Sequence, residues 1–422
     1  MLLIQNARVM DPKTNTDKVA DVLVEDGKIK EIGIVPVTDE MEIIDANGLI
    51  LAPGFIDVHV HFRDPGQTRK EDLVTGSKAA AAGGFTTVIC MANTIPKVDN
   101  VDTLTDILER AKKLPIHVLQ ASAVTKSFNG RDLVDMEAMK KAGAVGFTDD
   151  GLPIMNAGVL KKAMEEAKRL NVPISLHEED SSLVIKAGIN KGKVSEELQF
   201  GGAPAVAEDT MVARDCMIAL ATGASVDIQH ISSKNAVEMV RQAKAMGANV
   251  VAEATPHHFT LTEDAVKKYG AMCKMNPPVR TEDDRQAIIR GLQDGTIEII
   301  ATDHAPHTTE EKEAGIEKSP SGIIGLETAL SLGITSLVKE GHLTMMKLLE
   351  KMTINPANLY HLDAGYIAVG KEADFVLFDE NETYVIGDTF ASKSCNTPFI
   401  GWELTGKVKY TICNGKVVYT DR

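Results

Sequence analysis

Two histidines stand two positions apart in an apolar stretch of the chain. The run Phe55 to Phe62 is rich in residues that favour β-strands; Pro53-Gly54 precedes it and Asp64-Pro65-Gly66 follows it. Side chains two positions apart on a strand point to the same side, so His59 and His61 would project together. Two such imidazoles form half of a metal site, although a pair of hydrogen-bonded core histidines is the simpler alternative. The remaining ligands must therefore come from other parts of the chain.

Residues of the same kinds end four later apolar runs, at Asp150, His177, His230 and Asp303. Each one alone has an ordinary explanation, since Asp149-Asp150-Gly151 could be a turn and a histidine at a strand end can hydrogen-bond a loop. With the first pair they make four histidines and two aspartates, too many for one tetrahedral zinc ion but suited to two neighbouring ions. One aspartate could bridge the ions, because a carboxylate has two oxygens.

These residues need elements that bring them together, and the chain offers eight predicted strands. Helical patterns rich in Ala, Lys and Glu lie between most of them, for example at 72–82, 157–170 and 205–222. Eight parallel strands alternating with helices predict an α/β fold, a (β/α)8 TIM-like barrel, in which the C-terminal strand ends meet at one mouth. The predicted strands cover residues 55–62, 85–91, 116–122, 144–148, 172–177, 225–230, 249–255 and 297–302.

Three further polar residues follow these strands and could contact a substrate. A guanidinium group beside a metal site can bind a carboxylate through two hydrogen bonds, which suits Arg63; the alternative is a surface ion pair with Asp64 or Glu71. Asn93 and Asn276 could donate their amides to the same ligand, although an asparagine after a strand is often a turn residue.

Other histidines also lie near the predicted mouth. The composition of the polar segment 308–319 predicts a solvated loop. It could also act as a mobile lid over the mouth, with His307 near its base. The pair His257-His258 is the main rival for a metal-binding role. We prefer His230, because His257 follows Pro256 beyond its strand and its placement is less well defined.

The two ends of the chain have a different pattern from the middle. Residues 1–52 alternate like short strands, with a hairpin signal at Asp26-Gly27, and a second hairpin signal occurs at Asn414-Gly415. We therefore expect residues 1–52 and 366–422 to form one small β-sandwich domain. The metal-dependent barrel, residues 53–365, would be inserted between them.

Composition narrows the class of protein. The 422 residues include 45 Lys and Arg against 60 Asp and Glu, a net charge of −15 that argues against nucleic acid and anionic membranes as partners. The five cysteines are scattered and never spaced as Cys-x-x-Cys, which is typical of reduced thiols in the cytoplasm. The sequence predicts no signal peptide and no membrane span. We expect a cytoplasmic protein that acts on a small molecule.

The segments that carry the candidate ligands and substrate contacts resemble the amidohydrolase superfamily and, within it, the bacterial class I dihydroorotases. The His-x-His pattern alone marks only the superfamily, whereas the segments around Asp150, Asn276 and Asp303 are much more specific. The resemblance runs through almost the whole chain. Its matching segments are Pro53 to Gly66, Gly83 to Val88, Phe147 to Gly151, His177 to Asp180, Lys274 to Pro278, Ala301 to His307 and Asn396 to Phe399.

The resemblance implies a role for each of these residues. It implies two Zn²⁺ per subunit, bridged by Asp150 where related enzymes use a carboxylated lysine. The other implied ligands are His59, His61 and Asp303 for one ion and His177 and His230 for the second. The implied substrate contacts are His61, Arg63, Asn93, Asn276, His307 and the backbone of Ser321 and Gly322.

The reaction implied is the zinc-dependent, reversible cyclisation of N-carbamoyl-L-aspartate to L-dihydroorotate plus water, the third step of de novo pyrimidine (UMP) biosynthesis. Two zinc ions would lower the pKa of a bridging water and so provide the hydroxide that attacks the ring carbonyl. Asp303 would act as the general base and then as the general acid.

Two alternatives stay open. The chain could be another cyclic amidohydrolase, such as an allantoinase or a hydantoinase, but Asp150 at the bridge and Arg63 argue against this. It could also be a non-catalytic scaffold of the pyrimidine pathway, which the complete ligand set disfavours. Family members often have proline at the position of Ala92 and an aromatic residue at that of Ser321, so a ring-packing contact is in doubt. A homodimer and a complex with aspartate transcarbamoylase are left open.

Overall fold

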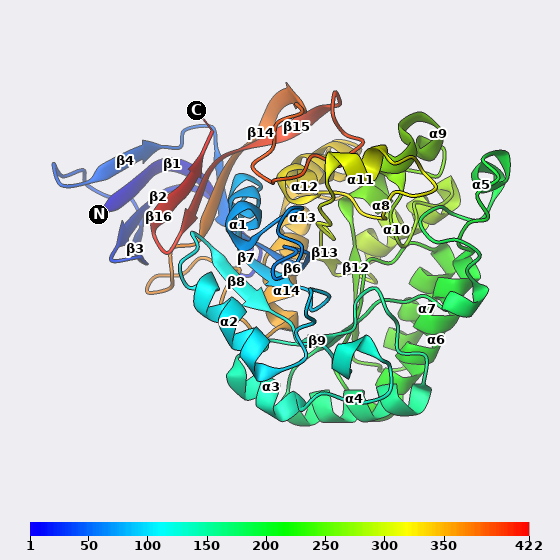
Figure 1. Ribbon diagram of the computed structural model, residues 1–422. Helices are drawn as coiled ribbons and strands as arrows, with labels where there is room; N and C mark the ends of the chain where they lie inside the picture. Colours follow the sequence, from blue (N-terminus) through cyan, green and yellow to red (C-terminus); the bar gives the residue numbers. More distant parts are fainter. Residues whose placement is uncertain (422) are drawn as a thin grey trace.

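The computed structural model describes residues 1–421, a mixed α/β protein in which helices surround two parallel sheets (Figure 1). One sheet has five strands in the order β13-β12-β11-β10-β9, and the other has three in the order β6-β7-β8. These strands are β6 (Phe55–Val60), β7 (Phe85–Cys90), β8 (His117–Gln120), β9 (Phe147–Thr148), β10 (Ile174–Leu176), β11 (Val226–Ile228), β12 (Val250–Ala254) and β13 (Ile299–Ile300).

Helices follow most of these strands, and their ends carry ordinary capping residues. The helix at 157–170 begins after Asn156, whose side chain accepts from two backbone N–H groups, and ends at Asn171 in the left-handed region. The helices are α1 (Leu73–Ala82), α2 (Val101–Ala111), α3 (Met136–Ala142), α4 (Ala157–Leu170), α5 (Lys193–Glu197), α6 (Ala205–Thr222), α7 (Lys234–Ala245), α8 (Pro256–Thr260), α9 (Ala265–Tyr269), α10 (Glu282–Asp294), α11 (Thr309–Glu313), α12 (Ala329–Gly333), α13 (Met345–Met352) and α14 (Ile354–Leu359).

Several parallel strands end earlier than their apolar runs predict. The run 225–230 yields a strand that stops at Ile228, and the run 297–302 yields one that stops at Ile300. Just beyond these ends, His230 and Asp303 have positive φ angles of 34° and 48°. Non-glycine residues seldom adopt this conformation, and it turns the chain out of the sheet at the positions where polar side chains were predicted to meet.

Both ends of the chain contribute strands to one further sheet, which lies to the left in Figure 1. Its order is β16-β15-β14-β5-β1-β2-β3, and β4 also pairs with β1. The sequence predicts a β-sandwich, whereas the structure has a single sheet here. The two halves join because β5 pairs with β1 on one side and with β14 on the other. The strands are β1 (Leu2–Asp11), β2 (Thr16–Glu25), β3 (Lys28–Gly33), β4 (Glu42–Asp45), β5 (Ile50–Pro53), β14 (Phe375–Val385), β15 (Glu403–Cys413) and β16 (Lys416–Thr420).

Aromatic side chains join this sheet to the parallel strands. The ring of Phe55 in β6 lies 5.6 Å from that of Phe85 in β7 and 6.5 Å from that of Phe378 in β14, and all three side chains are buried. The apolar core is therefore continuous between the two parts of the molecule. Within residues 1–421, no helix combines the length and the apolar character needed to span a bilayer.

Candidate metal centre

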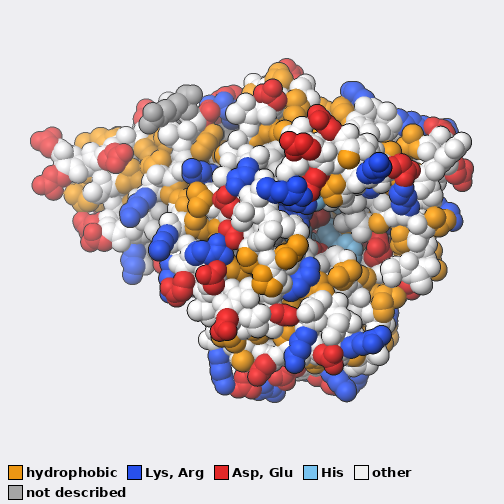
Figure 2. Space-filling model, viewed as in Figure 1, with side chains coloured by type: hydrophobic (Ala, Val, Ile, Leu, Met, Phe, Trp, Pro, Cys, Tyr) orange, Lys and Arg blue, Asp and Glu red, His pale blue; other side chains and the backbone are white. Residues whose placement is uncertain are grey.

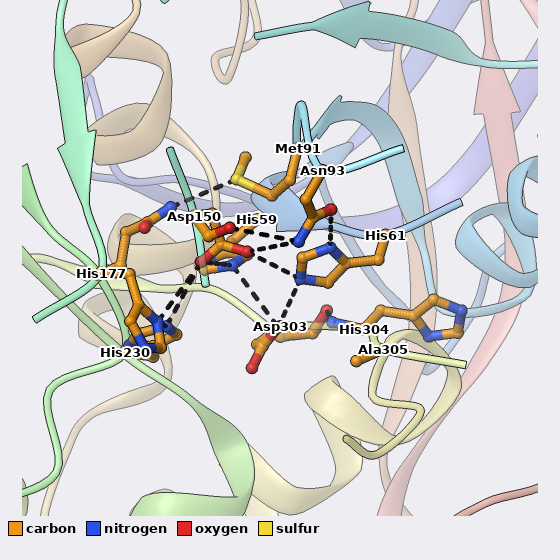
Figure 3. A network of polar contacts seen from close by, with 12 residues as sticks. His59, His61, Met91, Asn93, Asp150, His177, His230, Asp303, His304 and Ala305 are labelled. Atoms are coloured by element: carbon orange, nitrogen blue, oxygen red, sulfur yellow. Dashed lines mark hydrogen bonds and ion pairs between the residues drawn. The ribbon is translucent and has the colours of Figure 1, made fainter. Parts of the chain in front are cut away.

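The four histidines and two aspartates predicted as ligands lie together at the C-terminal ends of the parallel strands (Figure 3). All six side chains are buried. His59 lies in β6 and His61 just after it; the others follow β9 (Asp150), β10 (His177), β11 (His230) and β13 (Asp303).

Asp150 lies at the centre of the cluster. Its Oδ1 is 3.5 Å from Nε2 of His59, 3.6 Å from Nδ1 of His177 and 3.7 Å from Nε2 of His230. Its Oδ2 is 3.5 Å from Nε2 of His61. The two carboxylate oxygens thus face different sets of imidazole nitrogens, which is the arrangement a bridging ligand needs.

Asp303 closes the other side of the cluster. Its Oδ1 lies 2.9 Å from Nε2 of His61 and 3.5 Å from Nε2 of His59. Burial disfavours the charged carboxylate, but the neighbouring imidazoles of His59 and His61 outweigh it, and the pKa of Asp303 falls well below its ordinary value. Asp303 is therefore an ionised carboxylate in this site.

The donor atoms suit a cation. Nε2 of His59 is buried and has no hydrogen-bond partner among the described residues, and Nδ1 of His177 lies only 2.9 Å from Nε2 of His230. Two facing imidazole nitrogens can both be satisfied by a metal ion, whereas a hydrogen bond between them needs a proton on one ring. Three groups of ligand atoms each come close enough to bind an ion: His59, His61 and Asp150; His59, His230 and Asp303; and Asp150, His177 and His230. Nitrogen and oxygen ligands of this kind are those of protein zinc sites.

The residues predicted to contact substrate surround the same space. They line a cavity of about 190 Å³ next to the ligand cluster. In Figure 2, histidine side chains (pale blue) are visible in a recess on this face. The predicted residues that line the cavity are His61, Arg63, Asn93, Asn276, His307, Ser321 and Gly322.

Arg63 points toward His307. Its Nη2 is 3.5 Å from Nε2 of His307, and its Nε donates to the backbone oxygen of Pro306 (3.3 Å). The alternative partners have other contacts: Asp64 accepts two hydrogen bonds from Arg110, and Glu71 accepts from Ser392. The guanidinium group is thus directed into the cavity rather than toward the surface.

Asn93 and Asn276 contact the predicted ligands directly. Nδ1 of His61 donates to Oδ1 of Asn93 (3.0 Å), and Nδ2 of Asn93 donates to Oδ2 of Asp150 (3.0 Å). Nδ2 of Asn276 lies 3.4 Å from Nε2 of His177. Both amides therefore orient ligand side chains as well as lining the cavity.

The backbone of Ser321 and Gly322 lies close to His307. The Ser321 carbonyl accepts from Nε2 of His307 (2.8 Å), so this contact does not depend on which side chain stands at position 321. Gly322 has φ +142°, and a Cβ there would lie 2.8 Å from Nε2 of His307. Glycine is required at this position by both conformation and space.

The predicted lid, residues 308–319, is tied to the cavity wall by a lysine that sequence reasoning missed. Lys312, in α11, is buried, and its Nζ donates to the backbone oxygens of Lys274 (3.3 Å), Pro320 (3.1 Å) and Gly322 (2.9 Å). A lysine in a polar segment gives no sequence signal of burial, because the surrounding charges predict a solvated loop.

The rival histidines have other partners. His258 contacts Thr255 through Nδ1 (2.7 Å) and the carbonyl of Pro277 through Nε2 (3.0 Å). His257 is buried but belongs to none of the three ligand groups. In Figure 3 the ring of His304 points away from the cluster, and its Nε2 lies 3.5 Å from Glu71.

One group of metal-binding residue types occurs away from this site, where β8 meets β14 and β15. It contains His117, Asp374 and Cys413. Nε2 of His117 lies 3.0 Å from Oδ2 of Asp374, and Sγ of Cys413 is 3.8 Å from the carbonyl of Thr86. Ordinary hydrogen bonds therefore account for the group.

Sequence comparison places the chain among known proteins. A model of the amidohydrolase family matches residues 50–418. The chain is 60% identical over 420 residues to a dihydroorotase from Clostridioides difficile (strain 630), covering 99% of this chain and 100% of the relative. It is 53% identical over 424 residues to a dihydroorotase from Clostridium acetobutylicum, covering 100% of each.

Solved structures with the same fold come from proteins with different names. An L-hydantoinase (dihydropyrimidinase) from Arthrobacter aurescens matches with a TM-score of 0.88 at 26% identity, over 99% of this chain and 96% of that one. A D-hydantoinase (dihydropyrimidinase) from Thermus sp. matches with a TM-score of 0.86 at 26% identity, over 100% and 96% of the two chains.

Proposed function

The chain belongs to the amidohydrolase family, and we propose that within it this protein is a dihydroorotase, which interconverts N-carbamoyl-L-aspartate and L-dihydroorotate. The family and the full-length relatives make it a hydrolase of cyclic amides. The observation that carries the substrate assignment is the position of Arg63, whose guanidinium faces the same cavity as the buried ligand cluster. A carboxylate beside the scissile amide fits that arrangement.

We infer that the eight parallel strands close into one barrel. Single parallel bridges support this on both sides of the gap between the two sheets, at Ser122 and Phe147 and at Val60 and His304. A closed barrel would bring all the strand ends to one mouth, where the cavity lies.

We propose two Zn²⁺ as the metal complement. His59, His61 and Asp303 would hold one ion and His177 and His230 the other, and Asp150 would serve both, since its carboxylate lies within 3.7 Å of a nitrogen of each of the four histidines. Zinc at this site would polarise the carbonyl under attack and make a water acidic enough to ionise near neutral pH.

Asp303 is the proposed proton carrier. Its carboxylate is ionised and projects into the cavity, so it can accept the proton of the attacking water and pass it to the ring nitrogen that leaves. In the direction of synthesis the same carboxylate takes a proton from the carbamoyl nitrogen as that nitrogen attacks the substrate carboxyl group.

Arg63, Asn93 and His307 are the proposed binding group for the ring carboxylate. Burial, reinforced by the charges of Arg63 and Lys70, lowers the pKa of His307 to about 2, so this ring is neutral. Lys70 donates to its Nδ1 (3.2 Å), which leaves the proton on Nε2, facing the cavity. His307 would therefore supply no charge, and its Nε2–H, which the Ser321 carbonyl accepts in this structure, would donate to the substrate only in place of that contact; Arg63 would supply the charge.

A hydantoinase activity is the second candidate, because solved structures of hydantoinases share the fold. Hydantoin and allantoin lack a ring carboxylate, so neither would use the guanidinium of Arg63. This difference favours dihydroorotate as the substrate.

We also propose a cytoplasmic location, in keeping with five cysteines that all remain free thiols. Homodimer formation and a complex with aspartate transcarbamoylase stay predictions.

The cyclisation reaction tests the proposed function. Purified protein loaded with zinc is expected to convert N-carbamoyl-L-aspartate to L-dihydroorotate, with the yield rising as the pH falls because ring closure releases water from a carboxyl group that must be protonated. A zinc-loaded, folded protein that forms no dihydroorotate would refute the assignment.

A further inference from the structure

We infer that Glu253, a residue that no predicted role includes, is a positioning residue that holds both halves of the candidate metal centre in place. Glu253 lies in β12 and is fully buried beneath the ligand cluster. It is the one charged residue of the strand segment Val250–Ala254, whose other members are apolar.

The first contact fixes the ring of His59. Nδ1 of His59 lies 3.0 Å from Oε2 of Glu253. A carboxylate oxygen only accepts, so the ring proton sits on Nδ1 and the lone pair of Nε2 is directed the other way. That Nε2 is buried, has no hydrogen-bond partner among residues 1–421 and lies 3.5 Å from both Asp150 and Asp303. Glu253 therefore selects the tautomer of His59 that can bind a cation.

The second contact holds the backbone of His230. The N–H of His230 donates to the same oxygen of Glu253 (3.3 Å), and His230 has a positive φ of 34°. A non-glycine residue in this region is strained and needs support from its surroundings. Through one oxygen, Glu253 thus reaches a residue of each proposed zinc-binding set.

The burial of Glu253 supports a role in cation binding. A buried carboxylate is costly unless a positive charge and hydrogen bonds compensate it. Among residues 1–421 its ion-pair contact is with His59; the neighbouring Asp227, whose pKa burial and the charge of Glu253 raise well above its ordinary value, is a neutral acid that can hydrogen-bond Glu253 but brings no positive charge. A cation on the far side of the His59 ring would supply the compensation, and the carboxylate would in turn make the imidazole a stronger ligand.

Zinc affinity measures this role directly, and the inference rests on the proposed zinc site. Metal-free protein would be titrated with Zn²⁺ against a chromophoric chelator for the wild type, Glu253→Gln and Glu253→Ala. Glutamine keeps the shape and an acceptor oxygen but removes the charge, so we expect zinc binding to weaken about 10-fold; alanine removes both contacts and is expected to weaken it by up to about 100-fold.

Glu298→Gln is the matched control. Glu298 is a partly buried carboxylate that pairs with Lys244, beside the start of β13 and away from the cluster. Its substitution should leave zinc affinity unchanged. Thermal unfolding separates a general loss of stability from a loss of zinc binding. Without zinc, Glu253→Gln should melt within a few degrees of the wild type; when zinc is added, it should gain less stability than the wild type.

The possible outcomes are distinct. Unchanged zinc affinity in Glu253→Gln, or an equal loss in Glu298→Gln, would overturn the inference. If Glu253→Ala fails to fold, the glutamine variant decides. A wild type that binds zinc without dihydroorotase activity would refute the proposed substrate alone, and a wild type that binds no zinc would refute both proposals.

Discussion

Nε2 of His61 and Oδ1 of Asp303 lie 2.9 Å apart, although 242 positions separate the two residues in the chain. They meet because the segment after β6 runs beside the segment after β13, where the N–H of His61 donates to the carbonyl of His304 (2.9 Å). The contact places an ionised carboxylate against the imidazole of a candidate ligand at the edge of the cavity. It supports the proposal that Asp303 both binds metal and transfers the proton.

Asp303→Asn is expected to abolish turnover while the protein still folds. The amide has the same shape but cannot carry the proton, so kcat for dihydroorotate should fall by about 10²-fold to 10⁴-fold. Steady-state kinetics with a melting curve and a metal assay of the same sample would test this. Activity at the wild-type level would contradict the proposed role of Asp303.

His177→Ala is expected to lose one equivalent of bound metal. His177 faces Oδ1 of Asp150 and Nε2 of His230 but contacts neither His59 nor His61, so removing its ring should leave the other proposed site intact. Elemental analysis after gel filtration measures the metal content. His361→Ala changes an exposed histidine and serves as the control. Undiminished metal in His177→Ala would show that His177 is not a ligand.

Lys312→Met should loosen the segment that forms the wall of the cavity. The ammonium group donates to three backbone oxygens, two of them at Pro320 and Gly322, and methionine fills the space without replacing those hydrogen bonds. Burial lowers the pKa of Lys312 to about 7, so the amine is only partly charged at neutral pH, and each lost hydrogen bond is worth about 0.5–1.5 kcal/mol. We expect a raised KM for dihydroorotate, faster proteolysis within 308–319 and unchanged metal content.

The exposed Lys318 provides the control for this variant, because it lies in the same loop. Lys318→Met should behave as the wild type in all three measurements. If Lys312→Met leaves KM and proteolysis unaltered, the lysine does not position the wall.

The ion pair between His117 and Asp374 should make stability depend on pH. The hydrogen bond to Asp374 raises the pKa of His117 above its ordinary value, against the effect of burial. The stabilisation is then fully present below the unfolded-state pKa of about 6.5 and is lost as the pH rises through the higher folded-state pKa. His117→Asn should therefore destabilise the protein by about 1 kcal/mol near pH 6 and by less near pH 9.

Melting temperatures of the wild type and His117→Asn at these two pH values would check the prediction. His361→Asn, at an exposed histidine with φ of 55° that asparagine tolerates, is the control. A difference between wild type and His117→Asn that grows with pH would contradict the predicted stabilisation by protonated His117.

Much of the architecture could be predicted because periodic patterns report burial. The helical patterns at 157–170 and 205–222 correspond to α4 and α6, and the candidate ligands fall where apolar runs end. The joining of β5 to β14 could not be predicted, because pairing between distant strands depends on contacts that no local pattern encodes. The same holds for the positive φ of His230 and Asp303, which the surrounding structure imposes.

The partners of two buried ionisable residues could not be predicted from the sequence. Lys312 stands in a charged segment that predicts solvent, so only the fold reveals its three carbonyl partners. Glu253 did carry a signal, since a single acidic residue in an apolar strand must have a partner when buried. What the sequence could not supply was the identity of that partner, His59.

Substrate discrimination by the zinc-loaded protein tests whether it is a metal-dependent dihydroorotase. Hydrolysis of L-dihydroorotate, allantoin and hydantoin would be measured side by side, each with and without a chelator. We expect turnover of dihydroorotate alone, and its loss when the chelator removes the metal. Turnover of hydantoin or allantoin in preference to dihydroorotate would contradict the proposed substrate, and dihydroorotate turnover that survives complete removal of the metal would contradict the proposed metal dependence.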